Sequence, residues 1–481
     1  MTTTPRRVSY VHSAELARVG DALPSNLGRA SLVHALISSY GLLDGDRDND
    51  AELTGDGTRA SVVPPVAATR QELMTFHDGE FIAGVDSLLG SETSSPSSSA
   101  SESDSDSSTS SESPRRKRRK TRHDASSLVD DCPPFPLLSR YVPLVAGASL
   151  TGARQLRDGL ADVAISWTGG RHHASRGEAK GFCYIIDIVL SIMELRKKPL
   201  APGRHKLNKV LYLDLDLHHG DAVESAFASS PYILTLSLHL HAPLFYPATG
   251  SLNSSGPTNV KAAGRGHALN LALESGLAGE SLKRVWETVE RVKSSFAPDA
   301  VVVQCGVDGL NGDPCKEWNL SLSDYGHCVS AILDWNVPTL LLGGGGYSSP
   351  NAARTWTYLT SLCLNRPSPS PSTCQIPSSL APEEYEQFSP SFTLDVEASE
   401  TIRDKNNDLT LSRVETAFEG YCRHLNERWG TPPTHAESLK RQREAVEAPP
   451  KGEEAAASGG KPRKTVRFDL DDAQERATGV P

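Results

Sequence analysis

The sequence predicts an α/β fold in which a central, mostly parallel sheet is flanked by helices. Three observations predict it. Short apolar runs with the length of buried strands recur between residues 135 and 365. Amphipathic stretches that are long enough for helices separate these runs. Polar motifs follow directly where several runs end, which is the edge at which parallel α/β sheets bind ligands.

The expected strands and helices alternate along the chain. The strands cover residues 162–167, 210–215, 232–237, 300–304 and 339–342. The helices cover residues 183–197, 221–228, 281–296 and 323–335. Strands that are apolar on both faces and alternate with helices are typical of a parallel sheet that is covered on both sides. We therefore expect the catalytic loops at the carboxyl ends of the strands.

Length and composition exclude several classes of protein. A chain of 481 residues is too long for a small disulfide-stapled scaffold, and its eight cysteines contain no Cys-x-x-Cys pair, so we expect reduced thiols. The net charge of −10 argues against nucleic-acid binding as the function of the whole chain. No apolar run approaches the roughly 18 residues of a membrane span. We expect a soluble, intracellular protein with no membrane partner.

Two polar segments interrupt and follow the predicted domain, which we place at residues 8–430. Residues 91–126 begin with serine, threonine and acidic side chains and continue into the basic run 115–122, so we expect a disordered insertion. The basic run is a candidate nuclear-import signal, which predicts a location in the nucleus and leaves the cytoplasm open; a nucleic-acid patch and a solvated loop are the alternatives. Residues 436–481 are expected to form a disordered tail.

The polar residues after strand 210–215 indicate a metal site. Asp214, Asp216 and His218 are spaced by two, so an extended backbone projects them to one side. Two carboxylates that leave an apolar strand repel each other unless a cation compensates them. Asp308, after strand 300–304, supplies a further ligand, and a set of two aspartates and one histidine leaves a position open, as in catalytic zinc sites. A solvated strand end is the alternative.

Two further motifs supply groups for proton transfer. His172 and His173 follow strand 162–167 on a glycine-containing turn, and the carboxylates of Asp214 and Asp221 are available to orient one ring each. Tyr347 follows four glycines after strand 339–342, where its phenol can donate a hydrogen bond to a developing oxyanion. A flexible turn with an incidental tyrosine is the alternative.

Taken together, these motifs resemble the class I zinc-dependent histone deacetylases, of the histone deacetylase 8 type. The resemblance covers about residues 8–365 and is carried by residues 169–174, 181–184, 214–221, 306–308 and 343–347. It implies an arginase-like α/β domain that hydrolyses the acetyl amide of lysine side chains, chiefly on histone tails, and so represses transcription through chromatin. Corepressor complexes would be its partners.

The resemblance also implies a role for each motif residue. Asp216, His218 and Asp308 would be the ligands of one zinc ion. His172 and His173 would be the tandem catalytic histidines, with Asp214 and Asp221 as their respective partners, and Tyr347 would polarise the carbonyl. The implied substrate-binding residues are Asp131 at the rim, Gly181, Phe182 and Tyr246 along the slot, and Arg29 near an internal cavity.

The family also binds potassium, which implies two structural cation sites in this chain. The inner site would use Asp214, Asp216, His218, Ser237 and Leu238. The outer site would use Phe227, Ser230 and Ile233.

Three positions depart from the family pattern. Arg171 stands where the family has Trp or Leu, Ile186 replaces an Asn, and Tyr246 replaces a Phe. A guanidinium at position 171 would disfavour a protonated histidine and would need its own partner. Because every ligand and proton-transfer position is filled, we expect an active, selective enzyme.

Two other functions remain open from the sequence. One is a different amidohydrolase of the same fold, such as a two-manganese arginase-like enzyme or an acetylpolyamine amidohydrolase. The other is a catalytically weak scaffold that binds acetylated tails or recruits corepressors. In the tail, residues 464–468 have the form of a docking peptide for protein phosphatase 1, although so short a pattern also arises by chance.

Overall fold

An eight-stranded sheet organises the chain in the computed structural model, which describes residues 5–45, 59–87, 128, 131–259, 261–366 and 371–430. The strand order is β2-β1-β3-β8-β7-β4-β5-β6, and every pairing is parallel. The strands are β1 Val8–Val11, β2 Ser61–Val63, β3 Val163–Ser166, β4 Val210–Asp214, β5 Ile233–Leu240, β6 Ala268–Leu273, β7 Ala300–Gln304 and β8 Thr339–Leu342.

The helices that accompany the sheet are mostly longer than its strands. They are α1 Ala14–Asp21, α2 Arg29–Ser39, α3 Arg70–Leu73, α4 Gly79–Ser87, α5 Leu138–Arg157, α6 Asp187–Leu195, α7 Asp221–Phe227, α8 Gly279–Phe296, α9 Leu322–Asp334, α10 Ser349–Cys363, α11 Pro382–Tyr385 and α12 Asp408–Trp429. Short 3-10 turns lie at Pro24–Asn26 and Glu386–Phe388.

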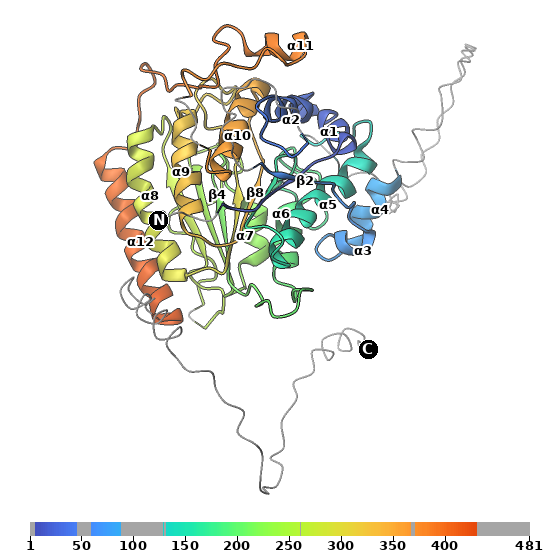
Figure 1. Ribbon diagram of the computed structural model, residues 1–481. Coiled ribbons are helices and arrows are strands. Elements are labelled where there is room, and N and C mark those ends of the chain that lie inside the picture. The colour runs from blue at the N-terminus through green and yellow to red at the C-terminus, as the bar shows by residue number, and fades with distance from the viewer. Residues whose placement is uncertain are drawn as a thin grey trace, which may run out of the picture. The chain divides into compact units, whose positions relative to one another are not determined.

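Alternate side chains of the central strands enter two separate hydrophobic clusters, as the two-residue repeat of a strand requires. Leu211 and Leu213 of β4 belong to a cluster that includes residues of α2, α8, α9, α10 and α12. Val210 and Tyr212 of the same strand belong to another cluster, which includes residues of α5, α6 and α7. Figure 1 shows α8, α9 and α12 on one side of the sheet and α5, α6 and α7 on the other. Both faces are therefore buried, which explains why the strands are almost continuously apolar.

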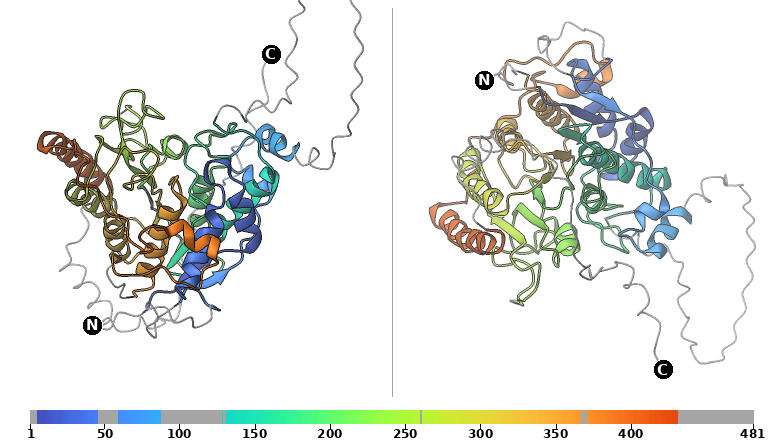
Figure 2. Two further views of the ribbon diagram at one scale, coloured as in Figure 1. Left: turned by 90° about the horizontal axis from the view of Figure 1, so that it is seen from above. Right: turned by 60° about the horizontal axis from the view of Figure 1, so that its bottom comes forward.

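Helix starts are marked by local hydrogen bonds that the sequence encodes. The Ser321 side chain accepts from the backbone N–H of Asp324, whose carboxylate accepts in return at the start of α9. At the start of α12, the Asn407 side chain accepts from the N–H of Thr410. In Figure 2, α12 lies alongside α8, and the two helices are in extensive contact.

The register of strand pairing places the carboxyl ends of four strands at the same height along the strand direction. Asp214 at the end of β4 pairs with Gln304 at the end of β7 and with Ser237 in β5. Ser166 at the end of β3 pairs with Leu342 at the end of β8, which also pairs with Gln304. Since β3, β8, β7 and β4 are consecutive in the sheet, the loops that follow them meet at one edge.

The predicted fold class is confirmed, and the sheet is wholly rather than mostly parallel. All five expected strands are present, whereas β1, β2 and β6 were not anticipated. The helix expected at 183–197 begins only at Asp187, because residues 181–186 form a loop in which Phe182 has a positive φ of 59°.

Some predictions concern segments outside the described residues. The insertion 91–126 with its basic run 115–122, the tail 436–481 and the docking sequence 464–468 all lie there. Among the helices that are described, none combines the length and the apolar character that crossing a bilayer requires.

Candidate active site

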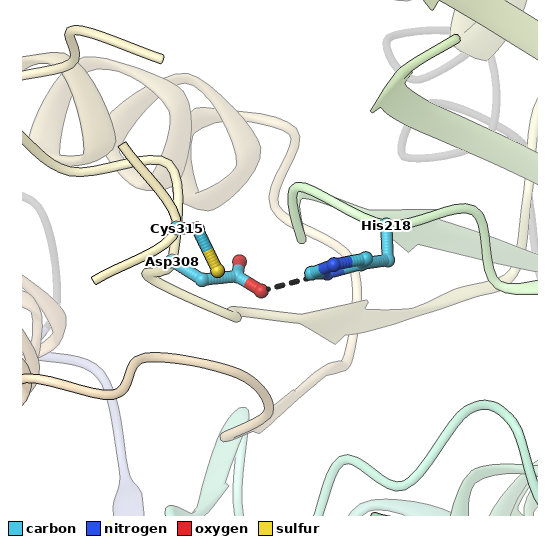
Figure 3. Close-up of side chains that lie close together, drawn as sticks. All are labelled: His218, Asp308 and Cys315. Atoms are coloured by element: carbon cyan, nitrogen blue, oxygen red, sulfur yellow. Dashed lines mark hydrogen bonds and ion pairs between the residues drawn. The ribbon is translucent and has the colours of Figure 1, made fainter. Parts of the chain in front are cut away.

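The predicted metal ligands converge at the carboxyl ends of β4 and β7. His218 Nδ1 lies 3.2 Å from Asp216 Oδ1 and 2.9 Å from Asp308 Oδ2. Both aspartates are 1% exposed. Figure 3 shows the His218 ring facing the Asp308 carboxylate, with the Cys315 thiol beside them. The three side chains that the sequence assigned to one cation are therefore close enough to contact a common atom.

The opposite oxygens of the two carboxylates are fixed by the protein. Asp216 Oδ2 accepts from Gln304 Nε2 at 2.7 Å and from the Gly345 N–H at 2.9 Å. Asp308 Oδ1 accepts from the Leu217 N–H at 2.9 Å. A side chain at position 345 would not fit, because a Cβ atom there would lie 2.4 Å from Asp308 Oδ2. These contacts leave Asp216 Oδ1 and Asp308 Oδ2 turned toward His218 Nδ1.

The electrostatics of this trio suit a divalent cation. Burial and the neighbouring charge of Asp216 raise the pKa of Asp308. Two carboxylates in contact within a buried site would otherwise repel each other, and a cation removes that cost. Two carboxylate oxygens and one imidazole nitrogen are also ligands that catalytic zinc takes. The residues present therefore fit the expected metal.

The tandem histidines, which follow β3, each contact the predicted carboxylate. The Nδ1–H of His172 donates to Asp214 Oδ2 at 2.9 Å, and that of His173 donates to Asp221 Oδ1 at 2.8 Å. Each ring therefore presents Nε2 on its other side.

The two histidines are driven to opposite protonation states. Burial disfavours the charged form of His172, but Asp214 and Asp216 outweigh it and raise the pKa to about 9. Burial and the charge on His172 lower the pKa of His173 to about 3. At neutral pH the pair thus combines a charged His172 with a neutral His173 that can accept a proton. The effect of Arg171 on the protonation of these histidines stays a prediction.

Tyr347 lies beside the metal trio and keeps its proton. Burial, followed by the charges of Asp308 and Asp216, raises the pKa of the Tyr347 phenol well above its usual value. Its ring meets that of Phe182 edge to face with centroids 5.9 Å apart. A phenol that stays protonated is a hydrogen-bond donor, which is the function predicted for it.

Arg29 contacts the glycine run rather than a carboxylate. Its guanidinium donates to the carbonyl oxygens of Gly344 at 3.0 Å and Gly346 at 2.7 Å, and it lies 4.8 Å from the centre of the Trp356 ring. The side chain is buried, so these bonds hold the backbone that precedes Tyr347.

The predicted rim and slot residues lie around His173. Asp131 Oδ2 accepts from the Gly181 N–H at 2.9 Å, and Phe182 remains 39% exposed. The Tyr246 ring stands edge-on to His173 at 5.0 Å, and its buried hydroxyl has no hydrogen-bond partner among the described residues. A cavity of about 720 Å³ opens beside them and is lined by His173, Asp131 and Tyr246, among others.

The structure also places the two remaining residues that differ from the family pattern, Arg171 and Ile186. Arg171 is buried, its Nη2 donates to the Thr168 carbonyl at 3.2 Å, and its Nε has no partner among the described residues. Ile186 is buried and its N–H donates to His77 Nε2.

The residues predicted to bind potassium lie on or beside β4, α7 and β5. Asp214 of β4 pairs with Ser237 of β5, which also contains Ile233 and Leu238. At the end of α7, the Phe227 carbonyl accepts from the Ser230 N–H. Cation binding there stays a prediction.

Three residues of the site were not anticipated from the sequence. The Asp313 carboxylate accepts from the N–H groups of Cys315 at 2.9 Å and Tyr347 at 2.7 Å. Lys180 Nζ lies 2.7 Å from Asp221 Oδ2, so Lys180 and His173 share one carboxylate. Asp313 had a weak indication, since it stands in a Gly-Asp-Pro turn shortly after Asp308. No sequence pattern indicated a role for Lys180 or Cys315.

The comparisons with known proteins agree with this arrangement. The histone deacetylase domain matches residues 24–363. Histone deacetylase 8 of Danio rerio is 35% identical over 422 residues, which cover 87% of this chain and 96% of that protein. Histone deacetylase 8 of Xenopus tropicalis is 35% identical over 419 residues, covering 86% and 98%. The chain therefore belongs to the histone deacetylase family and is a protein-lysine deacetylase of the hydrolase class.

Proposed function

We propose that the protein removes acetyl groups from lysine side chains of histones and other proteins with one zinc ion held by Asp216, His218 and Asp308. The observation that carries this proposal is that one carboxylate oxygen each of Asp216 and Asp308 lies within 3.2 Å of His218 Nδ1. When bound, zinc supplies a Lewis acid that polarises the acetyl carbonyl and acidifies a water molecule.

The histidines perform the proton transfers. Neutral His173 accepts a proton from the attacking water at Nε2, because its Nδ1–H is held by Asp221. It then returns this proton to the lysine amine as that group leaves. His172, whose Nδ1–H is held by Asp214, tunes the electrostatics next to the developing oxyanion.

The tyrosine and the slot orient the substrate. Tyr347 donates its phenol hydrogen to the carbonyl oxygen as negative charge develops there. Phe182 and Tyr246 line the passage for the methylenes of the lysine side chain, and Asp131 lies at its rim near Gly181. Potassium would bind at the predicted inner and outer sites.

The biological setting is proposed from the sequence. The basic run 115–122 supports a location in the nucleus, where acetylated histone tails are the substrates and corepressor proteins are the partners. Deacetylation there would repress transcription. The sequence 464–468 supports docking of protein phosphatase 1, which a pull-down comparing the natural tail with a Val466→Ala, Phe468→Ala tail tests.

The enzymatic proposal is tested with full-length protein and an acetyl-lysine histone peptide. We expect about one zinc per chain by elemental analysis and turnover that a hydroxamate chelator abolishes. A protein that holds one zinc and does not deacetylate any such peptide would contradict the proposal and favour a scaffold function.

A further inference from the structure

A thiol lies next to two of the proposed metal ligands. One ligand atom from each of His218, Asp308 and Cys315 lies within 4.8 Å of the others. Figure 3 shows the Cys315 sulfur beside the carboxylate that faces the histidine. Cys315 is also the one cysteine of the eight that is not buried. It is thus both accessible and adjacent to a metal-binding group of residues.

The backbone of Cys315 is anchored, so its thiol position depends mainly on one torsion angle. The Cys315 N–H donates to Asp313 Oδ1 at 2.9 Å, and the next residue, Lys316, has a positive φ of 56° in the same turn. Rotation about χ1 between staggered positions moves a cysteine sulfur by about 3 Å without moving the backbone.

The distances allow the sulfur to reach a shared metal ion. Zinc lies about 2.3 Å from sulfur and about 2.0–2.2 Å from nitrogen or oxygen, so donors around one tetrahedral ion are about 3.4–3.7 Å apart. The present cluster, within 4.8 Å, is wider than this by about 1 Å. This difference is smaller than the distance of about 3 Å by which a change of the Cys315 rotamer moves the sulfur. A thiolate is moreover a preferred ligand of zinc and of cobalt.

We propose that Cys315 is a further ligand of the metal ion held by Asp216, His218 and Asp308, and that it takes the open position when substrate is absent. This inference rests on the proposed metal site. When the sulfur–metal bond forms, the thiol of the partly exposed Cys315 gives its proton to solvent. When a substrate carbonyl displaces the sulfur, that bond breaks and the thiolate takes a proton back. The residue therefore makes substrate binding compete with an internal ligand.

Cobalt substitution tests the inference by a readout other than activity. Full-length protein is stripped of metal, loaded with Co²⁺ and compared with Cys315→Ala and with Cys422→Ala, a control on α12, which packs on α8. We expect visible cobalt bands in all three proteins. We expect an intense near-ultraviolet band of sulfur-to-cobalt charge transfer in the natural protein and in Cys422→Ala, and its loss in Cys315→Ala.

The possible results separate this inference from the function on which it depends. Visible cobalt bands without the charge-transfer band in the natural protein would overturn the role of Cys315 and leave the metal site intact. Failure of all three proteins to bind cobalt would overturn the metal site itself, and with it this inference.

Thiol labelling provides a second measurement. The full chain is treated with iodoacetamide with and without bound zinc, and the labelled peptides are quantified by mass spectrometry. We expect Cys315 to be labelled in the stripped protein and at least about tenfold more slowly in the loaded one, because a coordinated sulfur is a poorer nucleophile. The seven buried cysteines serve as internal controls. Equal labelling rates of Cys315 in both states would overturn the proposal.

Discussion

The backbone N–H of Tyr347 donates a 2.7 Å hydrogen bond to the carboxylate of Asp313, a buried residue. The other oxygen of that carboxylate accepts from the Cys315 N–H. Asp313 therefore connects the loop after β7 to the loop after β8, and the phenol of Tyr347 depends on it for its place.

Replacing Asp313 with Ala is expected to lower kcat by about tenfold or more with a smaller effect on KM, because a displaced donor weakens transition-state binding most. Two partly buried N–H groups would lose their acceptor, each at a cost below the about 1–3 kcal/mol of a fully buried group, so the melting temperature should fall as well. Steady-state kinetics and a thermal melt measure both effects. An unchanged kcat in a folded Asp313→Ala protein would exclude the positioning role.

The Tyr347→Phe change removes only the hydroxyl. We expect kcat to fall by about 10²–10³, as is typical when one oxyanion donor is lost, while the fold is retained. Deacetylation assays and a circular dichroism melt test this expectation. A variant that keeps more than about half of its activity would show that another group polarises the carbonyl.

Lys180 is expected to tune the basicity of His173 through the carboxylate of Asp221 that they share. The neighbouring cation contributes to the low pKa of Asp221 and disfavours a proton on His173. Lys180→Met should therefore raise the pKa of His173 and move the acid limb of the kcat/KM profile to higher pH. The shift should stay below about one pH unit, because the lysine side chain is 38% exposed and solvent screens it.

A matched control exists for this change. Lys197, which follows α6, forms a comparable ion pair with Glu194 of that helix, and Lys197→Met should leave the pH profile unchanged. If both variants shift the acid limb equally, or if Lys180→Met shifts it to lower pH, the local explanation fails.

His77 is expected to make the fold sensitive to acid. Burial lowers the pKa of His77 to about 4, while an unfolded chain has a histidine pKa of about 6.5. Between about pH 6.5 and about pH 4 the unfolded chain therefore binds a proton that the folded chain does not, so the free energy of unfolding falls as pH falls. The loss reaches about 3–4 kcal/mol at most.

Melting temperatures at neutral and mildly acidic pH measure this loss. His77→Gln retains an acceptor for the Ile186 N–H and a donor for the Arg176 carbonyl, which the ring contacts in the natural protein. Its melting temperature should depend less steeply on pH. A variant with an unaltered pH dependence would assign acid sensitivity to other buried groups.

Much of the fold follows from the sequence because the central strands are apolar on both faces. Several of the elements that escaped prediction depart from this pattern. β2 has three residues and is largely exposed, and β6 contains the buried polar Asn270. The helix α5 contains Pro143 and small residues such as Gly147, where a Cβ would lie 2.2 Å from the Val66 carbonyl oxygen. Their identity depends on tertiary contacts rather than on local periodicity.

The residues of the candidate site likewise fall into a group that was predictable from the sequence and a group that was not. Asp216, His218 and Asp308 were predictable because each follows a recognisable strand end and carries metal-binding chemistry. Lys180, Asp313 and Cys315 were not, because their roles arise from contacts between loops that are distant in sequence. Residue type alone makes a surface lysine or a lone cysteine unremarkable.

The contact between Arg29 and the glycine run changes how the amino-terminal region is regarded. A stretch of four glycines has large conformational freedom in an isolated peptide. In this protein the Arg29 guanidinium of α2 donates hydrogen bonds to the carbonyl oxygens of Gly344 and Gly346. A shortened chain that starts beyond α2 would retain every metal donor, both histidines and the tyrosine. It would nevertheless lose the hydrogen bonds from Arg29 that hold the backbone before Tyr347. The amino-terminal helices therefore contribute to the active site and are not a dispensable extension.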